Sequence, residues 1–299
     1  MNDWPLVSVL MTSFNREEFI SDSIQSVLNQ TYSNFELIIV DDCSTDGTIK
    51  KVNSFNDARI KIYQNEENIG QFPNRNLAAS YAQGTLLFYV DSDDLILENT
   101  LSHIVSLFLR FPTAHFLTLN RDPFYQVEGV INSTEMVRRH FFECSNLHYG
   151  PGATAITKEL FHAIGGFPLN YGPAGDNFYN LQAALNTDVI ICKLEFLNYR
   201  RHDGQEINNP KAYLYHGYNY FFDIIKNEKM PLTNDEKKYF ILKNKQRFFI
   251  NTFLYFLKSG DFRGASYATK ISKLRLLDVL EVLIKFNRHV KSVREINHS

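Results

Sequence analysis

This sequence of 299 residues has little cysteine, no long apolar run and no excess of charge of one sign. Its cysteines, Cys43, Cys144 and Cys192, are an odd, scattered set without metal-binding spacing, so we expect reduced thiols in the cytosol. The net charge of −2 gives no electrostatic footprint for nucleic acid, and no nucleic-acid partner is expected. No transmembrane span is predicted, and a strand predicted directly after residues 1–5 argues against a signal peptide. A cytoplasmic protein is therefore expected.

Several well-known nucleotide-binding and catalytic motifs are also missing. No G-x-G-x-x-G follows the first predicted strand, which argues against a dinucleotide-binding fold. The chain has no Gly-Lys-Ser/Thr loop, which excludes a P-loop, and no G-x-S-x-G that would indicate an esterase.

The first hundred residues alternate instead between predicted strands and helices. Strands are predicted at residues 7–11, 35–40, 59–63 and 86–90, and helices at residues 16–29, 48–55 and 72–82. The alternation at 59–63 places Ile60 and Ile62 inward and Lys61 outward, as on a strand near a sheet edge. Helices between successive strands predict an α/β fold with a mostly parallel sheet, which binds ligands beyond the carboxyl ends of its strands.

Polar clusters follow three of these strands, at residues 12–15, 41–42 and 91–94. The last cluster, Asp-Ser-Asp-Asp, ends a run of five apolar residues, and burying three carboxylates there is costly without a compensating cation. Carboxylate oxygens suit Mg²⁺ or Mn²⁺, which would neutralise phosphate. The alternative is a turn, and one of the three aspartates is expected to cap a helix that begins near Leu97. Three coincident clusters favour a ligand site.

The order and spacing of these segments resemble family-2 glycosyltransferases over roughly the first third of the chain. The segments that carry the resemblance are residues 8–15, 41–48, 68–70, 75–76 and 91–94. The resemblance implies a GT-A fold, a Rossmann-like mostly parallel sheet flanked by helices. It also implies a nucleotide-diphosphate sugar donor, expected to be UDP-linked, Mn²⁺ or Mg²⁺ as cofactor, and inversion at the anomeric centre.

The resemblance further implies roles for individual residues. The expected nucleotide-sugar-binding residues are Thr12, Asn15, Asp41, Asp42, Asn68, Arg75, Asp91 and Ser92. Within that set Asp42 is expected to hydrogen-bond the base, with Asp41 supporting the turn. Asp93 and Asp94, which the sequence does not rank, are the expected metal ligands together with His202, for which a diphosphate contact is the alternative. Arg200 or Arg201 is expected to neutralise the leaving group.

The acceptor side and the general base are implied by a looser similarity in the second half. Gly152 and Ala153 are expected to leave room for a sugar acceptor, with a tight turn before a strand as the alternative. Asp176 is the implied general base for the acceptor hydroxyl, and it is also suited to cap a helix at 177–185. The family often has Glu-Asp at this point, whereas this chain has Gly175 before the aspartate.

The C-terminal region is predicted to be a helical appendage at residues 208–299, after a catalytic domain at residues 1–207. An aromatic-rich helix from residue 211 is followed by helices at residues 235–258 and 263–291. Leucines and basic residues alternate in the last of these, so peripheral contact with the inner face of a membrane is one interpretation. Packing within the protein, or a homodimer, is the alternative, and packing is favoured.

These observations predict an inverting glycosyltransferase that moves a sugar to a saccharide or lipid-linked acceptor in polysaccharide or glycoconjugate biosynthesis. A sugar nucleotidyltransferase is one alternative, although it would normally show a glycine-rich loop with a basic residue after the first strand. A non-catalytic nucleotide-sugar-binding protein of a polysaccharide assembly complex is the other, and only the glycine at position 175 supports it.

Overall fold

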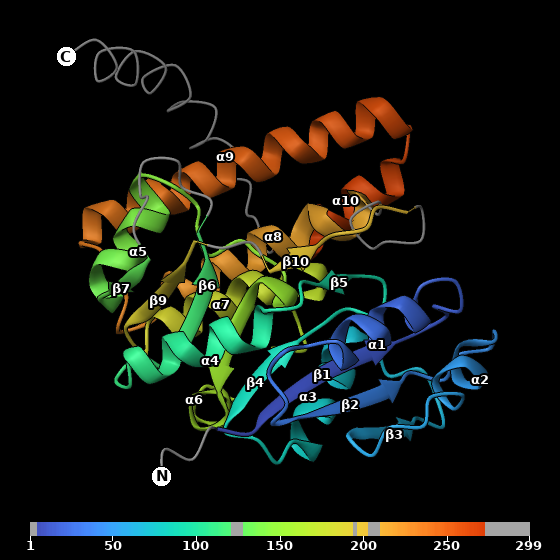
Figure 1. The fold of residues 1–299 in the computed structure, drawn as a ribbon. Coiled ribbons are helices and arrows are strands. Elements are labelled where there is room, and N and C mark those ends of the chain that lie inside the picture. Colours follow the sequence, from blue (N-terminus) through green and yellow to red (C-terminus); the bar gives the residue numbers. More distant parts are fainter. Residues whose placement is uncertain (1–4, 121–127, 194–195, 203–209, 273–299) are drawn as a thin grey trace. The chain divides into compact units, whose positions relative to one another are not determined.

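The computed structural model describes residues 5–120, 128–193, 196–202 and 210–272 (Figure 1). The chain divides into two compact units. The first consists of Met1–Asn170 and Gly175–His202, and the second of Tyr171–Ala174 and Asp203–Ser299. The predicted boundary between residues 207 and 208 lies outside the described residues.

The first unit is built on a mixed sheet in the order β3-β2-β1-β4-β8-β6-β9-β7. Its strands are β1 Val7–Ser13, β2 Phe35–Asp41, β3 Ile60–Gln64, β4 Leu86–Tyr89, β6 Phe116–Leu119, β7 Gly129–Ile131, β8 Thr154–Thr157 and β9 Val189–Cys192. The pairs β1–β2, β2–β3, β1–β4 and β6–β9 are parallel. Strand β8 runs antiparallel to β4 and β6, and β7 runs antiparallel to β9. The predicted α/β class is confirmed.

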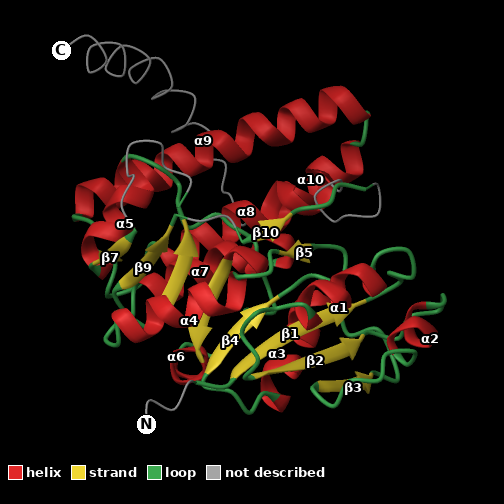
Figure 2. Cartoon of the chain, viewed as in Figure 1, coloured by secondary structure: helices red, strands yellow, loops and turns green. Residues whose placement is uncertain are grey.

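Helices of the first unit surround this sheet (Figure 2). They are α1 Ile20–Leu28, α2 Thr48–Val52, α3 Gln71–Tyr81, α4 Thr100–Arg110, α5 Ser133–Phe142, α6 Lys158–Ala163 and α7 Gly175–Ala184, with a 3₁₀ turn η1 at Pro151–Ala153. Because β4 is buried along its whole length, Phe88 packs into one core with Ile24 of α1 and Ile104 of α4. This core fixes the carboxyl ends of β1, β2 and β4, where the polar clusters lie.

The aspartates after β4 do not cap a helix, which corrects one expectation. Leu95–Ile96 forms a short strand, β5, paired with β10 at Leu197–Asn198. Helix α4 then begins at Thr100 with Asn99 at its N-cap position. All three carboxylates are thereby left at the site.

Ile60 packs against the hydrophobic core as predicted, whereas Ile62, two residues further along the same face of β3, is less buried than expected. Ile62 is 37% exposed, because β3 is the edge strand and pairs on one side alone. Lys61 instead turns to the buried Glu36 of β2, with Nζ 2.7 Å from Oε2. The prediction of an edge strand is correct.

The second unit is helical in its described part. It contains η2 Gly172–Ala174, α8 Pro210–Ile224, α9 Asn234–Ser259 and α10 Phe262–Ile271. Thr233 and Glu236 form a capping box at the start of α9, and Gly260 ends that helix in the left-handed conformation. The rings of Tyr218 and Phe248 pack 5.0 Å apart, as expected for packing within the protein.

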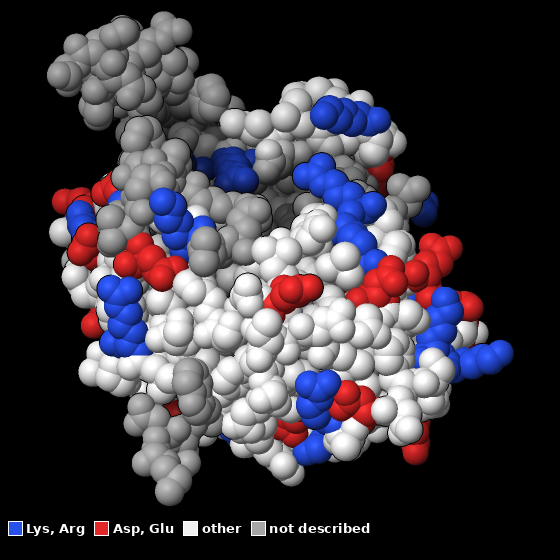
Figure 3. Space-filling model, in the orientation of Figure 1, with Lys and Arg blue, Asp and Glu red and all other residues white. Residues whose placement is uncertain are grey.

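The structure describes only part of the C-terminal region on which the membrane interpretation depends. Residues 273–299, with most of the predicted basic helix, lie outside the described residues. Among the helices that are described, none combines the length and the apolar character that crossing a membrane requires. On the face shown in Figure 3, basic and acidic side chains of the described residues are interspersed.

Candidate nucleotide-sugar site

The two carboxylates at the end of β2 are held by the chain itself. Asp41 is fully buried and accepts hydrogen bonds from the hydroxyls of Ser13 and Ser44 and from the Ser44 backbone N–H. Asp42 accepts from the Asn65 side chain at 2.8 Å and from the backbone N–H groups of Ile69 and Gly70, each at 2.9 Å. Asp41 therefore supports the turn as expected, and Asp42 anchors the loop that leads into α3. Contact of Asp42 with a base stays a prediction.

The polar residues after β1 pack against the same turn. The side-chain oxygen of Asn15 accepts the backbone N–H of Thr45 at 2.9 Å, and Asn15 has a positive φ of 51°. Asparagine tolerates this left-handed conformation better than most residues. Thr12 is half-buried at the end of β1, and Asn68 is exposed on the loop before α3. Their proposed nucleotide contacts stay predictions.

Asp91 and Arg75 form the first cluster beyond β4. The Arg75 guanidinium is buried on α3 and forms an ion pair with the Asp91 carboxylate. Burial alone would lower the pKa of Arg75, but Asp91 and Asp176 raise it above its usual range. Within the described part of the chain, Arg75 Nε is buried without a hydrogen-bond partner. This cluster therefore offers one buried N–H donor to an anionic ligand.

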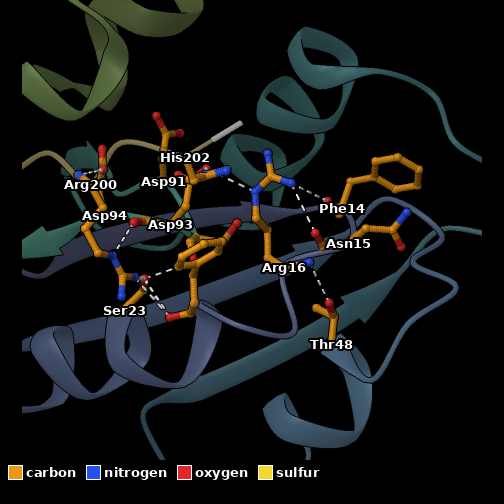
Figure 4. Close-up of polar contacts among 12 residues, drawn as sticks. Phe14, Asn15, Arg16, Ser23, Thr48, Asp91, Asp93, Asp94, Arg200 and His202 are labelled. Atoms are coloured by element: carbon orange, nitrogen blue, oxygen red, sulfur yellow. Dashed lines mark hydrogen bonds and ion pairs between the residues drawn. The ribbon is translucent and has the colours of Figure 1, made fainter. Parts of the chain in front are cut away.

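Asp93, His202 and Arg16 form the second cluster (Figure 4). Asp93 Oδ2 lies 2.9 Å from His202 Nε2 and 3.0 Å from Arg16 Nε. The His202 ring stacks on Phe19 with centroids 4.4 Å apart. The predicted association of Asp93 with His202 is thus present in the structure, although they are 109 residues apart.

Arg16 is a site residue that the sequence reasoning missed. Its guanidinium also donates to the backbone carbonyls of Phe14 and Asn15, each at 3.1 Å, and its backbone N–H donates to the Thr48 hydroxyl. These contacts hold residue 16 in a turn, so α1 begins at Ile20 and not at position 16 as predicted. Its place directly after the polar cluster at 12–15 was the available signal.

Asp94 and Arg200 lie beside that second cluster. Asp94 is 2% exposed, and its Oδ1 accepts the Arg200 backbone N–H at 3.0 Å. Burial, together with the charges of Asp91 and Asp93, raises the pKa of Asp94 to about 7. The Arg200 guanidinium donates to the Asp93 carbonyl and to the Ser23 hydroxyl. Arg200 therefore ties this loop to α1, and the leaving-group contact expected of Arg200 or of the exposed Arg201 stays a prediction.

Ser92, Gly152 and Ala153 are buried in the scaffold. The Ser92 carbonyl accepts the Ser23 hydroxyl at 2.9 Å. Ala153 belongs to the hydrophobic core, and a Cβ at Gly152 would meet Leu197 at an ordinary contact distance of 3.4 Å. These positions form the predicted tight turn before β8, and their contact with an acceptor stays a prediction.

Asp176 lies in the first turn of α7, which begins at Gly175, two residues earlier than predicted, so this residue is inside the helix and not at the predicted cap position. It is half-buried, and burial raises the pKa of its carboxyl to about 6 while Arg75 opposes that rise. A Cβ at Gly175 would lie 2.6 Å from the Phe72 ring, which stacks on Phe167. The Phe72 ring thus occupies the space that a larger residue at position 175 would need. Packing explains the glycine that stands before the aspartate.

The donor set at the end of β4 fits a divalent cation. Carboxylate oxygens and an imidazole nitrogen suit Mn²⁺ or Mg²⁺, and a cation would relieve the unfavourable burial of Asp94. Asp93 and His202 already share a contact. Among the described residues, however, Asp94 does not join them in a cluster with all ligand atoms within 4.8 Å. Asp93 and His202 are therefore the better-placed pair.

Comparisons with known proteins agree with this geometry. The chain is 46% identical over 110 residues to Escherichia coli WfgD, a "UDP-Glc:alpha-D-GlcNAc-diphosphoundecaprenol beta-1,3-glucosyltransferase", covering 37% of this chain and 43% of that protein. It is 45% identical over 97 residues to Bacillus subtilis TuaG, a putative teichuronic acid biosynthesis glycosyltransferase, covering 31% of this chain and 38% of that protein. These matches span less than half the length of each relative.

Solved structures show the same fold. S. aureus TarS residues 1–349 in complex with UDP-GlcNAc superpose with a TM-score of 0.66 at 19% identity, covering 92% of this chain and 78% of that one. Mannosyltransferase PcManGT from Pyrobaculum calidifontis, in complex with GDP-Man and Mn²⁺, gives a TM-score of 0.62 at 18% identity, covering 96% of this chain and 81% of that one. The expected GT-A fold is confirmed. The glycosyl transferase family 2 model matches residues 8–165, more than half of the sequence, and the chain belongs to that family.

Proposed function

We propose that this protein is an inverting glycosyltransferase that moves a sugar from a UDP-linked donor to a saccharide or lipid-linked acceptor in polysaccharide or glycoconjugate biosynthesis. Family membership and the names of the relatives support this proposal. The observation that carries it is the half-buried Asp176, whose pKa is raised to about 6 and whose charge interacts with Arg75 and Asp91. A carboxylate of that kind is suited to act as a base near neutral pH.

In this proposal the two clusters beyond β4 bind the donor. Arg75 contributes a buried positive charge and a free Nε donor, held by Asp91. Asp93 and His202 would hold Mn²⁺ or Mg²⁺, which when bound neutralises negative charge on the diphosphate. Asp42 anchors the loop between β3 and α3 beside which the base would lie.

The proposed chemistry is a direct displacement at the anomeric carbon. Asp176 removes the proton from the acceptor hydroxyl as its oxygen forms the new glycosidic bond. The bond between the anomeric carbon and the diphosphate oxygen breaks on the opposite face, and the electron pair leaves with the nucleoside diphosphate. With a pKa of about 6, Asp176 is mostly ionised at pH 7 and is a stronger base than an ordinary aspartate.

We assign catalysis to residues 1–207 and treat residues 208–299 as a helical appendage. A lipid-linked acceptor would bring the protein to the inner face of a membrane, with contact through the C-terminal helices. Exposed apolar side chains on α9 support such a contact; they are Ile250, Phe253, Leu254 and Leu257. A homodimer through the same helices is the competing proposal.

A donor panel and one substitution test this function. Incubation with UDP-, GDP- and dTDP-sugars should show turnover of a UDP-sugar. Asp176→Asn should lower transfer by about 10²–10⁴-fold, because it removes the base and keeps the size. Donor affinity should stay near wild type and Tm at neutral pH should not fall, because asparagine removes a charge whose burial raises the pKa of Asp176; Asp235→Asn at an exposed position of α9 is the matched control. Full transfer by Asp176→Asn would reject the assignment.

A further inference from the structure

A group of three potential metal ligands, none of them a residue of the donor site, is found elsewhere in the first unit. His103 is on α4, Glu128 directly precedes β7, and Cys192 is the last residue of β9. One ligand atom from each lies within 4.8 Å of the others, and His103 Nε2 is 2.8 Å from Glu128 Oε2. No role in nucleotide-sugar binding accounts for this arrangement.

The scaffold holds the three side chains in place. Cys192 is fully buried, and its backbone carbonyl accepts the Asn120 N–H at 2.7 Å beside the end of β6. His103 is flanked on α4 by the fully buried Leu101 and Ile104. The side chains of His103 and Glu128 are 22% and 23% exposed, so an ion can reach them from solvent.

We propose that His103, Glu128 and Cys192 bind one Zn²⁺ ion. An imidazole nitrogen, a carboxylate oxygen and a sulfur are the ligand types of zinc, whereas Mg²⁺ and Ca²⁺ take oxygen ligands. Binding requires that the thiol lose its proton to solvent, which leaves a thiolate on the metal. The fourth position of the tetrahedral ion is open to water.

Admitting the ion requires the three side chains to move, because ligand atoms that lie within 4.8 Å of one another must come to about 3.3–3.5 Å around a tetrahedral ion. Two ligand atoms at about 2 Å from a tetrahedral ion lie roughly 3.3 Å apart. The His103–Glu128 contact must therefore open by about half an ångström, and the neutral His103 ring must carry its proton on Nδ1 so that Nε2 can bind the ion. Strand β7 has three residues and pairs with β9 at the sheet edge. The bound ion would link the start of this edge strand to α4 and β9.

Cobalt is the probe that separates this site from the donor site. Co²⁺ substitutes for Zn²⁺ at such sites, and thiolate ligation adds a sulfur-to-metal charge-transfer band. Asp93, Asp94 and His202 contain no sulfur, so the band distinguishes binding at a cysteine from binding at the donor site. Titration of the full chain with CoCl₂ should give the band at one equivalent, and ZnCl₂ should bleach it.

Ligand substitutions and one control decide the result. Cys192→Ser should abolish the band, and His103→Gln and Glu128→Gln should each weaken Co²⁺ affinity by more than about 100-fold. Cys144→Ser, outside the cluster, should behave as wild type. Cys192 is fully buried, so Cys192→Ser can fail to fold for reasons of packing alone. In that case the result is decided by His103→Gln and Glu128→Gln, which change partly exposed side chains. Absence of the band in wild type, or wild-type affinity in both variants, would overturn the proposal.

Discussion

The ends of β2 and β4 carry the same residue type for two different purposes. At β2, every carboxylate oxygen of Asp41 and Asp42 accepts a hydrogen bond from the chain. At β4, the described contacts fall on one oxygen of each aspartate, and they include cationic side chains. The carboxylates at β2 are used by the fold, whereas those at β4 keep acceptor capacity for a cation or ligand. Burial cost and free lone pairs together mark a binding site better than the residue type does.

The largest effect on stability is expected from removing one of the carboxylates at the end of β2. Asp42→Ala leaves the partly buried N–H groups of Ile69 and Gly70 without acceptors and the Asn65 side chain without a partner carboxylate, so the free energy of unfolding should fall by about 2–5 kcal/mol. Urea denaturation measures this loss, and Asn68→Ala on the exposed part of the same loop should change little. If Asp42→Ala were as stable as wild type and lost only affinity for uridine, Asp42 would be a ligand-binding residue and not a structural one.

The pH dependence of sugar transfer tests the role of Asp176, whose carboxylate interacts with Asp91 at the end of β4. Since Asp176 must be ionised to act as base and its pKa is about 6, kcat/KM should fall about tenfold per pH unit below 6. The folded pKa lies above the ordinary value of 3.8, so this group's contribution to stability is present below pH 4 and is lost as pH rises through 6. An inflection near pH 4 would show an unperturbed carboxylate.

A gain in stability is expected when one of the carboxylates at the end of β4 loses its charge. The pKa of Asp94 is raised from 3.8 to about 7, so ionisation destabilises the fold as pH rises from 4 through 7. Asp94→Asn should therefore raise the unfolding free energy at pH 8 by roughly 1–2 kcal/mol in chelator, allowing for solvent screening. The difference should vanish at pH 4 and shrink when Mn²⁺ is added. A less stable variant at pH 8 would place Asp94 with the β2 carboxylates.

The smallest effect is expected at Arg16. Its ion pair with Asp93 joins a guanidinium 23% exposed to a carboxylate 11% exposed, and such pairs contribute little. Arg16→Gln should lower the free energy of unfolding by about 0.5–1 kcal/mol in low salt. Thermal unfolding measured with and without 1 M NaCl should show that salt makes this difference smaller. Lys61→Gln, which removes another partly exposed ion pair, is the comparison variant.

The sequence was most informative where local pattern and function coincide. The run of apolar residues ending in aspartates located β4, and the three polar clusters do converge at neighbouring strand ends. Arg16 and Asp93 are 77 residues apart, and their ion pair forms because they follow β1 and β4, which are neighbouring parallel strands in the folded chain. The same holds for His103, Glu128 and Cys192, which no spacing rule connects. The expected cap failed because β5 forms where a helix was expected to begin.

The contact between Phe72 and Gly175 restricts how this sequence can change. A glutamate at position 175 would collide with a ring already packed against Phe167, and a smaller residue at position 72 alone would leave a cavity. Each single step therefore passes through a less stable protein, while the double change restores the fit. The two positions should show strong epistasis and should covary among homologues, so that the ring and the glycine are inherited together.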